Sequence, residues 1–274
     1  AAGNRASTVV RLGYSTSYDT DKYVYFTGTS ADFDLGAVMD ALLMDYPYEM
    51  YWLNTLSSAR MNSITTYPED ILKWMEISMS VAVTFASGDY TADTAKTGAV
   101  TSAATKAAAI VAKYASASDY DKLVGYRNEI CALVSYDDTA ASGGDSYYKN
   151  TDSNPWQLIY VFDGNTATNV VCEGYSKAFQ YLCDMGGVPC ISVRGTMHYP
   201  NGNGGHMWNI VTLDGKNYLV DVTNSDEGTL GQNGELFLAG AAGSPASGYS
   251  FTAGGKTVSY GYGYNTPNIW TTEE

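Results

Sequence analysis

Apolar residues recur at helical spacing in one segment of the chain, and that segment opens with a cysteine. Five side chains share its apolar face: Tyr175, Ala178, Phe179, Leu182 and Cys183. They fall at i, i+3, i+4, i+7 and i+8, and Gly186-Gly187 supplies a stop signal. The pattern predicts a helix of about four turns that begins at Cys172.

The first half of the chain shows three more patterns typical of helices. One covers about 31–45, one is the Ala-rich segment from Thr94 to Ala115, and one covers 119–134. The start of the last is marked by Ser118 and, three residues later, Asp121, which are spaced like a capping box. We therefore expect residues 1–135 to be mostly helical.

Strand patterns are shorter and lie mostly in the second half. Strict alternation over about 76–86 predicts one strand, and the run 188–194 predicts another. Polar, Gly-rich composition predicts loops over 135–155 and 195–205.

A hairpin predicted near the end of this region allows a geometric test. Asp214-Gly215 between the apolar runs 206–213 and 216–223 is typical of a two-residue type I′ turn. If Leu213 and Lys216 flank that turn, Asp221 lies opposite Trp208, and His206 is a diagonal neighbour on the same face. A slip of one residue would separate the two side chains.

Composition limits the classes of function. The 274 residues carry a net charge of −14 and only 15 Lys and Arg, which argues against binding to nucleic acid or acidic lipid. No apolar run is long enough for a membrane span. The surface chemistry of hydroxyls and amides suggests a secreted or cell-surface protein. The start at Ala1 has neither Met nor a signal-peptide core, so we expect a secretion signal to have been removed.

The cysteine pattern does not predict a metal site. The chain has Cys131, Cys172, Cys183 and Cys190 but no C-x-x-C, and its two histidines are His198 and His206. We expect no metal and no cofactor. Cys131 is interpreted as structural, and Cys183 and Cys190 form either a local bridge or two packed thiols.

Cys172, His206 and Asp221 form a candidate catalytic triad. A helix N-terminus stabilises a thiolate, which is the nucleophilic form of cysteine. Asp221 would orient the His206 imidazole, whose other nitrogen would face the thiol. The alternatives are a buried structural cysteine and a strand histidine. His198 is the other candidate base, but it has no acidic partner at an interpretable spacing.

The residues around this triad resemble a known family. The matching segments are Val-Cys-Glu-Gly-Tyr-Ser-Lys-Ala-Phe (171–179), Gly-Gly-Val-Pro-Cys (186–190), His-Met-Trp-Asn-Ile-Val (206–211) and Asp-Gly-Lys-Asn-Tyr-Leu-Val-Asp-Val-Thr (214–223). Over about 155–225 the chain resembles the bacterial branch of the transglutaminase-like superfamily. The resemblance implies a papain-like fold in which Cys172 is the nucleophile, His206 the base and acid, and Asp221 the orienting group. Relatives usually have Trp where this chain has Asn224.

We therefore expect a single α+β domain over 1–274, with helices packed on an antiparallel sheet, a catalytic core at 155–225 and C-terminal strands at 226–274. Gln157 is a candidate oxyanion-hole donor beside the Cys172 N–H. Trp156 and Trp208 are candidate substrate contacts.

The expected activity is acyl transfer from a peptide or glutamine carboxamide through a cysteine thioester. Hydrolysis by a cysteine protease is favoured over amine transfer or deamidation, because no feature of the sequence indicates a tunnel that excludes water. A catalytically inactive cell-surface binding domain with the same fold is the alternative from another class.

Overall fold

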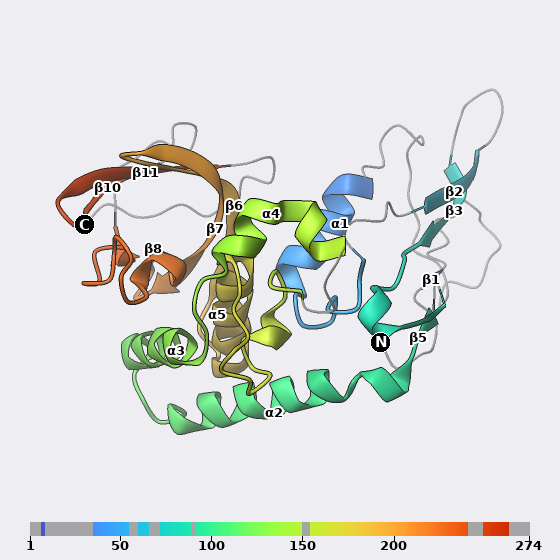
Figure 1. Ribbon diagram of the computed structural model, residues 1–274, viewed down its shortest axis with the longest axis horizontal. Helices are drawn as coiled ribbons and strands as arrows, with labels where there is room; N and C mark the ends of the chain where they lie inside the picture. The colour runs from blue at the N-terminus through green and yellow to red at the C-terminus, as the bar shows by residue number, and fades with distance from the viewer. Residues whose placement is uncertain are drawn as a thin grey trace. The chain divides into compact units, whose positions relative to one another are not determined.

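A computed structural model describes residues 7–8, 35–54, 60–65, 72–88, 91–149, 154–240 and 249–262 (Figure 1). The chain divides into two compact units, Ala1–Ala41 with Trp52–Gly98 and Leu42–Tyr51 with Ala99–Glu274. All candidate site residues lie in the second unit. The expected single domain stays a prediction.

The first unit contains small sheets where helix was expected. Strands β1 (Ser7–Thr8), β3 (Leu72–Ser78) and β2 (Arg60–Thr65) form an antiparallel sheet in that order, and β4 (Ala86–Gly88) pairs with β5 (Thr91–Ala92). The predicted strand over 76–86 is not continuous: β3 ends at Ser78, Val83–Phe85 forms a 3-10 helix (η2) that buries Phe85, and Ala86 begins β4. Helix α1 (Leu35–Asp45) matches the expected helix, whose first residues, 31–34, lie outside the described ranges.

The expected helices of the second unit are present. Helix α2 (Gly98–Lys113) follows a 3-10 turn, η3 (Thr94–Lys96), and buries Ala103 and Ala107 completely, which allows close packing. Helix α3 (Asp119–Leu133) is capped by Ser118, whose Oγ accepts from the Asp121 N–H at 3.1 Å. This confirms the predicted capping at Ser118.

The predicted polar loop over 135–155 is wrong in its middle. Residues Asp138–Lys149 form helix α4. The Asp137 carboxylate accepts from the Ala140 N–H at 2.8 Å and so caps the start of this helix. A satisfied cap at this end outweighs the low helix propensity of Gly143-Gly144.

The second unit is organised around a six-stranded sheet in the order β10-β11-β6-β7-β8-β9, in which all neighbours are antiparallel. Its strands are β6 (Cys190–Tyr199), β7 (Gly202–Leu213), β8 (Lys216–Val220), β9 (Phe237–Ala239), β10 (Tyr249–Ala253) and β11 (Lys256–Tyr262). Short strands after residue 226 were expected. Trp270 and the acidic end lie outside the described residues.

The β7–β8 hairpin has the predicted register. Asp214 and Gly215 both have positive φ, 52° and 77°, as a type I′ turn requires. Leu213 pairs with Lys216, and Asn209 pairs with Val220.

The predicted loop over 195–205 is wrong, because β6 and β7 continue through it and meet at a tight turn. Gly195 allows this, since a Cβ there would overlap the Gly261 carbonyl oxygen of β11.

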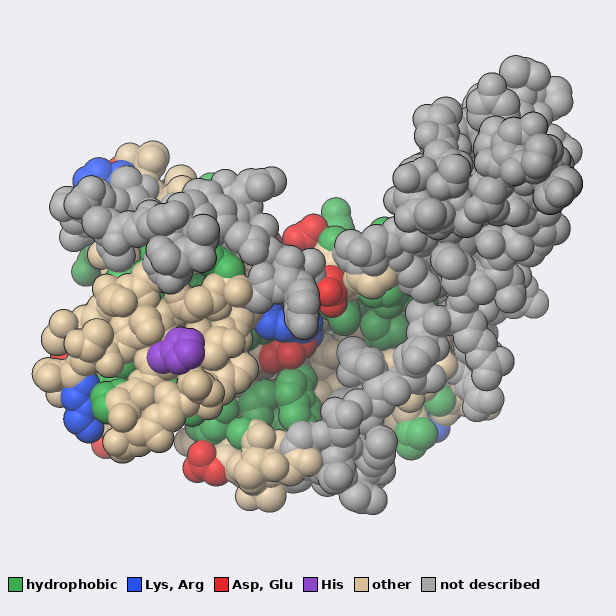
Figure 2. Space-filling view, turned by 90° about the horizontal axis from the view of Figure 1, so that it is seen from above, with side chains coloured by type: hydrophobic (Ala, Val, Ile, Leu, Met, Phe, Trp, Pro, Cys, Tyr) green, Lys and Arg blue, Asp and Glu red, His purple; other side chains and the backbone are tan. Residues whose placement is uncertain are grey.

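Helix α5 (Cys172–Gly186) packs against β6 and β7 and ends at Gly187, whose φ of 73° is left-handed. On the face drawn in Figure 2, charged side chains occur singly or in small groups, and hydrophobic side chains are exposed next to some of them. This distribution agrees with the 16% charged residues of the sequence.

Candidate active site

Cys172 is the first residue of α5 and is half-buried. Val171, the N-cap residue, gives no side-chain cap, and its own N–H donates to the Pro155 carbonyl at 3.0 Å. The first turn of the helix is therefore fixed by backbone contacts, and the thiol lies where unpaired N–H groups stabilise negative charge.

A pair of buried polar residues attaches this helix to β7 just beyond His206. Ser176, one turn after Cys172, donates to the Met207 carbonyl at 2.8 Å. The Asn209 amide donates to the Ser176 carbonyl at 3.0 Å. Because both bonds are buried, they hold the helix start in a fixed position relative to His206.

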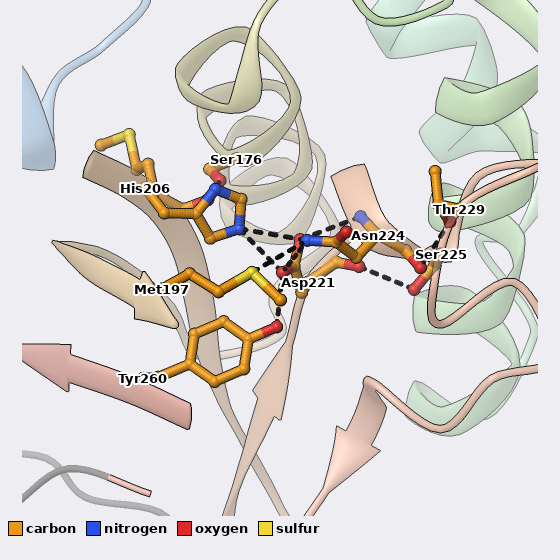
Figure 3. A network of polar contacts seen from close by, with 9 residues as sticks. Ser176, Met197, His206, Asp221, Asn224, Ser225, Thr229 and Tyr260 are labelled. Carbon is orange, nitrogen blue, oxygen red and sulfur yellow. Dashed lines mark hydrogen bonds and ion pairs between the residues drawn. The ribbon is translucent and has the colours of Figure 1, made fainter. Parts of the chain in front are cut away.

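The structure brings two of the predicted triad residues, His206 and Asp221, into direct contact (Figure 3). Nε2 of His206 lies 2.8 Å from Oδ2 of Asp221, as the hairpin register predicted. Cys172 lies near the same imidazole, close enough for its thiol to contribute to the raised pKa of His206. Since Nε2 faces Asp221, Nδ1 is the nitrogen left for the thiol. Only 9% of the His206 side-chain surface is exposed, and the Asp221 side chain is fully buried.

Two residues that the sequence analysis did not connect with Asp221 complete its surroundings. Tyr260 on β11 donates its hydroxyl to Oδ2 at 2.7 Å, and the Asn224 side-chain amide donates to the same oxygen at 2.7 Å (Figure 3). The Asn224 backbone N–H donates to Oδ1 at 3.1 Å. Asn224 thus contacts the carboxylate at the position where relatives usually have Trp.

The charges of the pair are mutually stabilised. Burial disfavours the imidazolium form of His206, but the Asp221 carboxylate outweighs it and raises the pKa of His206 from 6.5 to about 10. Burial likewise opposes ionisation of Asp221, yet His206, Tyr260 and Asn224 lower its pKa. An imidazolium–carboxylate pair is therefore the stable state at neutral pH.

A second ion cluster lies directly after the cysteine. Oε1 of Glu173 is 2.6 Å from Nζ of Lys177 and 3.6 Å from Nη2 of Arg194. Burial opposes ionisation of Glu173, but the two cations outweigh it and lower the pKa of Glu173. A thiolate at Cys172 consequently does not face an unpaired carboxylate.

A cleft of about 580 Å³ opens beside His206. Its lining includes Tyr136, Tyr199, Gly205, Asn224, Glu227 and Lys256. Tyr136 pairs with Val170, two residues before Cys172. Burial, and next the neighbouring Cys172, raises the pKa of Tyr136, so its hydroxyl stays protonated at the cleft wall.

The other predicted residues have different outcomes. Gln157 is 1% exposed, and its carboxamide oxygen has no hydrogen-bond partner in the described part of the chain. Trp156 is half-buried, so its predicted substrate contact remains open. The predicted contact at Trp208 is not supported, because Trp208 is 0% exposed and packs on Tyr260 in the core. The reason is that the Trp208 side chain points from β7 into the hydrophobic core of the sheet.

The remaining histidine and cysteines lie outside the triad. His198 is exposed on β6, opposite Asn203. Cys131 is half-buried, and burial raises the pKa of its thiol to about 12. Cys183 and Cys190 are free thiols, and burial raises the pKa of Cys183. Among the described residues no cluster of metal ligands occurs, and no helix there is long and apolar enough to cross a membrane.

Similar chains among solved structures include the following two. The first is the crystal structure of a TGase, with a TM-score of 0.40 and 14% identity over 80% of this chain and 56% of that chain. The second is a putative cysteine protease from Cytophaga hutchinsonii, with a TM-score of 0.33 and 14% identity over 63% of this chain and 68% of that chain. No protein-family model matches.

The resemblance to transglutaminase-like proteins that the sequence predicts is met again in these comparisons. In sequence, the chain is similar to Kyphoscoliosis peptidase. It is 32% identical to the Mus musculus protein over 115 residues and 34% identical to the Homo sapiens protein over 103 residues. These matches cover 39% and 34% of this chain but only 16% and 14% of the curated relatives.

Proposed function

We propose that the protein is a cysteine peptidase that cleaves peptide bonds through a thioester on Cys172. The observation that carries the proposal is the 2.8 Å contact of the His206 imidazole with the buried Asp221 carboxylate beside an open cleft, with Cys172 near enough to contribute to the raised pKa of that imidazole. A nucleophile, a proton carrier and an orienting group in this order are the parts that acyl transfer requires.

The raised pKa of His206 suggests how the cycle starts. In the proposed cycle the His206 imidazole takes the proton of the thiol before attack, and its raised pKa favours the imidazolium form that results. The Cys172 sulfur attacks the carbonyl carbon, and the new oxyanion accepts from the Cys172 N–H and, in this proposal, from Gln157. His206 then gives its proton to the leaving amine as the C–N bond breaks, and a thioester remains.

Hydrolysis of the thioester completes the proposed reaction. Neutral His206 takes a proton from water, the hydroxide oxygen attacks the thioester carbon, and the C–S bond breaks to release the acid and the thiolate. We favour water over an amine acceptor because polar side chains such as Asn224, Glu227 and Lys256 line the cleft, which supports access of water. A secreted or cell-surface location remains a proposal from the sequence.

Mass spectrometry of a denatured casein pool, incubated with the enzyme and a tagged primary amine, tests this proposal. The control is Cys172→Ala, which keeps the fold and removes the nucleophile. Cys172-dependent new peptide termini are expected.

Tagged glutamines without cleavage would replace the peptidase by a transglutaminase, and glutamate in place of glutamine would indicate a deamidase. Identical spectra for both proteins across pH 5–8 would contradict enzymatic activity and favour a binding domain.

A further inference from the structure

Strand β7 has an unpaired edge next to His206. It pairs with β6 from Gly202 to Val211, but with β8 only from Asn209 to Leu213. The chain leaves the sheet after Val220 and enters a 3-10 turn (η5, Thr223–Ser225). Within the described ranges, the segment Gly202–Trp208 therefore has a strand neighbour on one side only.

The two hairpins determine which backbone groups face this edge. Leu213 and Lys216 flank a two-residue turn and so exchange both hydrogen bonds, and the N–H and C=O groups of alternate residues point to the same side. Odd-numbered residues of β7, including Met207 and Gly205, therefore face the β8 side. The contacts agree: Thr212 N–H donates to Pro189 on the β6 side, whereas Met207 C=O accepts from Ser176.

Gly205 presents these groups to the cleft. It is exposed, lines the cleft immediately before His206, and has open space where a Cβ would lie, with no atom within 4 Å. In the described part of the chain, no hydrogen bond satisfies its outward N–H and C=O. A free donor and acceptor on one residue match the spacing of an adjacent antiparallel strand.

We propose that the Gly205 edge of β7 binds the main chain of the substrate as an added antiparallel strand. This rests on the proposed function and specifies its substrate class as an extended polypeptide. Strand addition draws affinity from main-chain hydrogen bonds and tolerates varied side chains. Free glutamine, or the side-chain amide of a folded protein, would bring no extended main chain to bond with the N–H and C=O of Gly205.

The glycine itself supports the assignment. A side chain at 205 is not excluded by packing, since nothing within 4 Å would oppose it. The absence of one leaves the backbone accessible along the cleft wall. The next residue in the cleft lining, Gly204, also lacks a side chain, although a Cβ there would lie 3.3 Å from the Tyr199 hydroxyl.

Alkylation of Cys172 tests the edge without knowledge of the natural substrate. Two reagents are compared: iodoacetamide, which has almost no main chain, and acetyl-Ala-Ala-Ala-chloromethyl ketone. In the second reaction the thiolate sulfur forms a bond to the methylene carbon, and chloride leaves as the C–Cl bond breaks. Rates are measured by mass spectrometry on wild type, Gly205→Pro and Gly205→Ala.

Gly205→Pro removes the outward N–H and no bond to β6, whereas Gly205→Ala keeps the N–H and is the matched control. We expect Gly205→Pro to slow the peptidyl reagent by about threefold to tenfold, the effect of one hydrogen bond, and to leave iodoacetamide unchanged. Gly205→Ala keeps both backbone groups, so it should slow the peptidyl reagent less than Gly205→Pro does. Equal peptidyl rates in all three proteins would overturn the inference.

A second measurement keeps the test informative if Gly205→Pro does not fold. Three peptidyl reagents, each N-methylated at one amide, are applied to the wild type, and at least one should react about threefold to tenfold more slowly. No effect of any methyl group would refute strand addition. Failure of the proposed function has a different signature: Cys172 would react with iodoacetamide no faster than the free amino acid.

Discussion

Tyr260 donates its hydroxyl to the same Asp221 oxygen that accepts from His206, at 2.7 Å and 2.8 Å respectively. Tyr260 is 1% exposed, and burial raises its pKa far above the ordinary value, so it remains a donor at all working pH values. Asp221 is thereby held as a carboxylate facing the imidazole. The Tyr260 hydrogen bond connects β11 to the His206–Asp221 pair. The pair itself comes from β7 and from the residue that follows β8.

Replacement of Tyr260 by Phe should destabilise the protein by about 1.5–3 kcal/mol, the usual contribution of a hydrogen bond to a charged group. Loss of the donor also raises the pKa of Asp221. The difference in unfolding free energy between wild type and variant should therefore become smaller as the pH falls and Asp221 becomes protonated. Urea unfolding at several pH values measures both effects. Tyr262→Phe is the control, since Tyr262 packs on Trp208 as well. Equal losses in both variants would exclude a specific role for the Asp221 contact.

Asn224 offers a test of charge at the same carboxylate. Asn224→Asp keeps the size of the side chain but places a second carboxylate where an amide donates at 2.7 Å. The added negative charge raises the pKa of Asp221 and so weakens the ion pair between Asp221 and the His206 imidazolium. We expect slower alkylation of Cys172 by iodoacetamide near pH 6 than in Asn224→Ala. Asn201→Asp adds the same charge elsewhere in the cleft lining and should behave as wild type.

The pH dependence of stability follows from the two shifted groups. The pKa of His206 is raised from 6.5 to about 10. Its contribution to the free energy of unfolding is therefore complete below pH 6.5 and is lost as the pH rises toward 10. The pKa of Asp221 is lowered from 3.8, so its contribution is complete above 3.8 and is lost at lower pH.

The stability difference between wild type and His206→Gln should therefore be largest near pH 5. Unfolding in urea at pH 5, 7 and 9 measures it, and a difference that grows toward pH 9 would contradict the assigned ion pair.

Gln157 is tested by separating turnover from thiol reactivity. If its amide stabilises the oxyanion, Gln157→Ala should reduce kcat on a peptide substrate by about 100-fold to 1000-fold. Alkylation of Cys172 by iodoacetamide forms no oxyanion and should not change. Gln180→Ala is a matched control, because Gln180 is also buried but donates to the Met44 carbonyl at 2.9 Å. Equal kcat losses in the two variants would assign Gln157 to stability alone.

Local signals explain which parts of the site were predictable. The Asp214-Gly215 turn determines the register of its hairpin, and the register brings His206 to Asp221. Tyr260 reaches the same carboxylate from 39 residues away. Its position depends on the pairing of β11 with β6, and no short-range pattern encodes which strands become neighbours.

Local patterns also misled in two places. Gly143-Gly144 favoured a loop, but the Asp137 cap allows α4. Glycines between 195 and 205 favoured a loop as well, although in β6 and β7 they remove side chains where a backbone or a cleft lies close.

Gly195 and Gly205, which lie on adjacent strands, give the last prediction. A Cβ on Gly195 would lie 2.7 Å from the Trp208 ring and overlap the Gly261 carbonyl oxygen, which is backbone and cannot rotate away. Gly195→Ala must therefore separate β6 from β11 or displace Trp208, and should cost about 1–3 kcal/mol. Gly205→Ala meets no atom within 4 Å and should leave the unfolding free energy nearly unchanged. Thermal and urea unfolding of both variants decide the matter, and equal stabilities would contradict the close approach of β11 to β6.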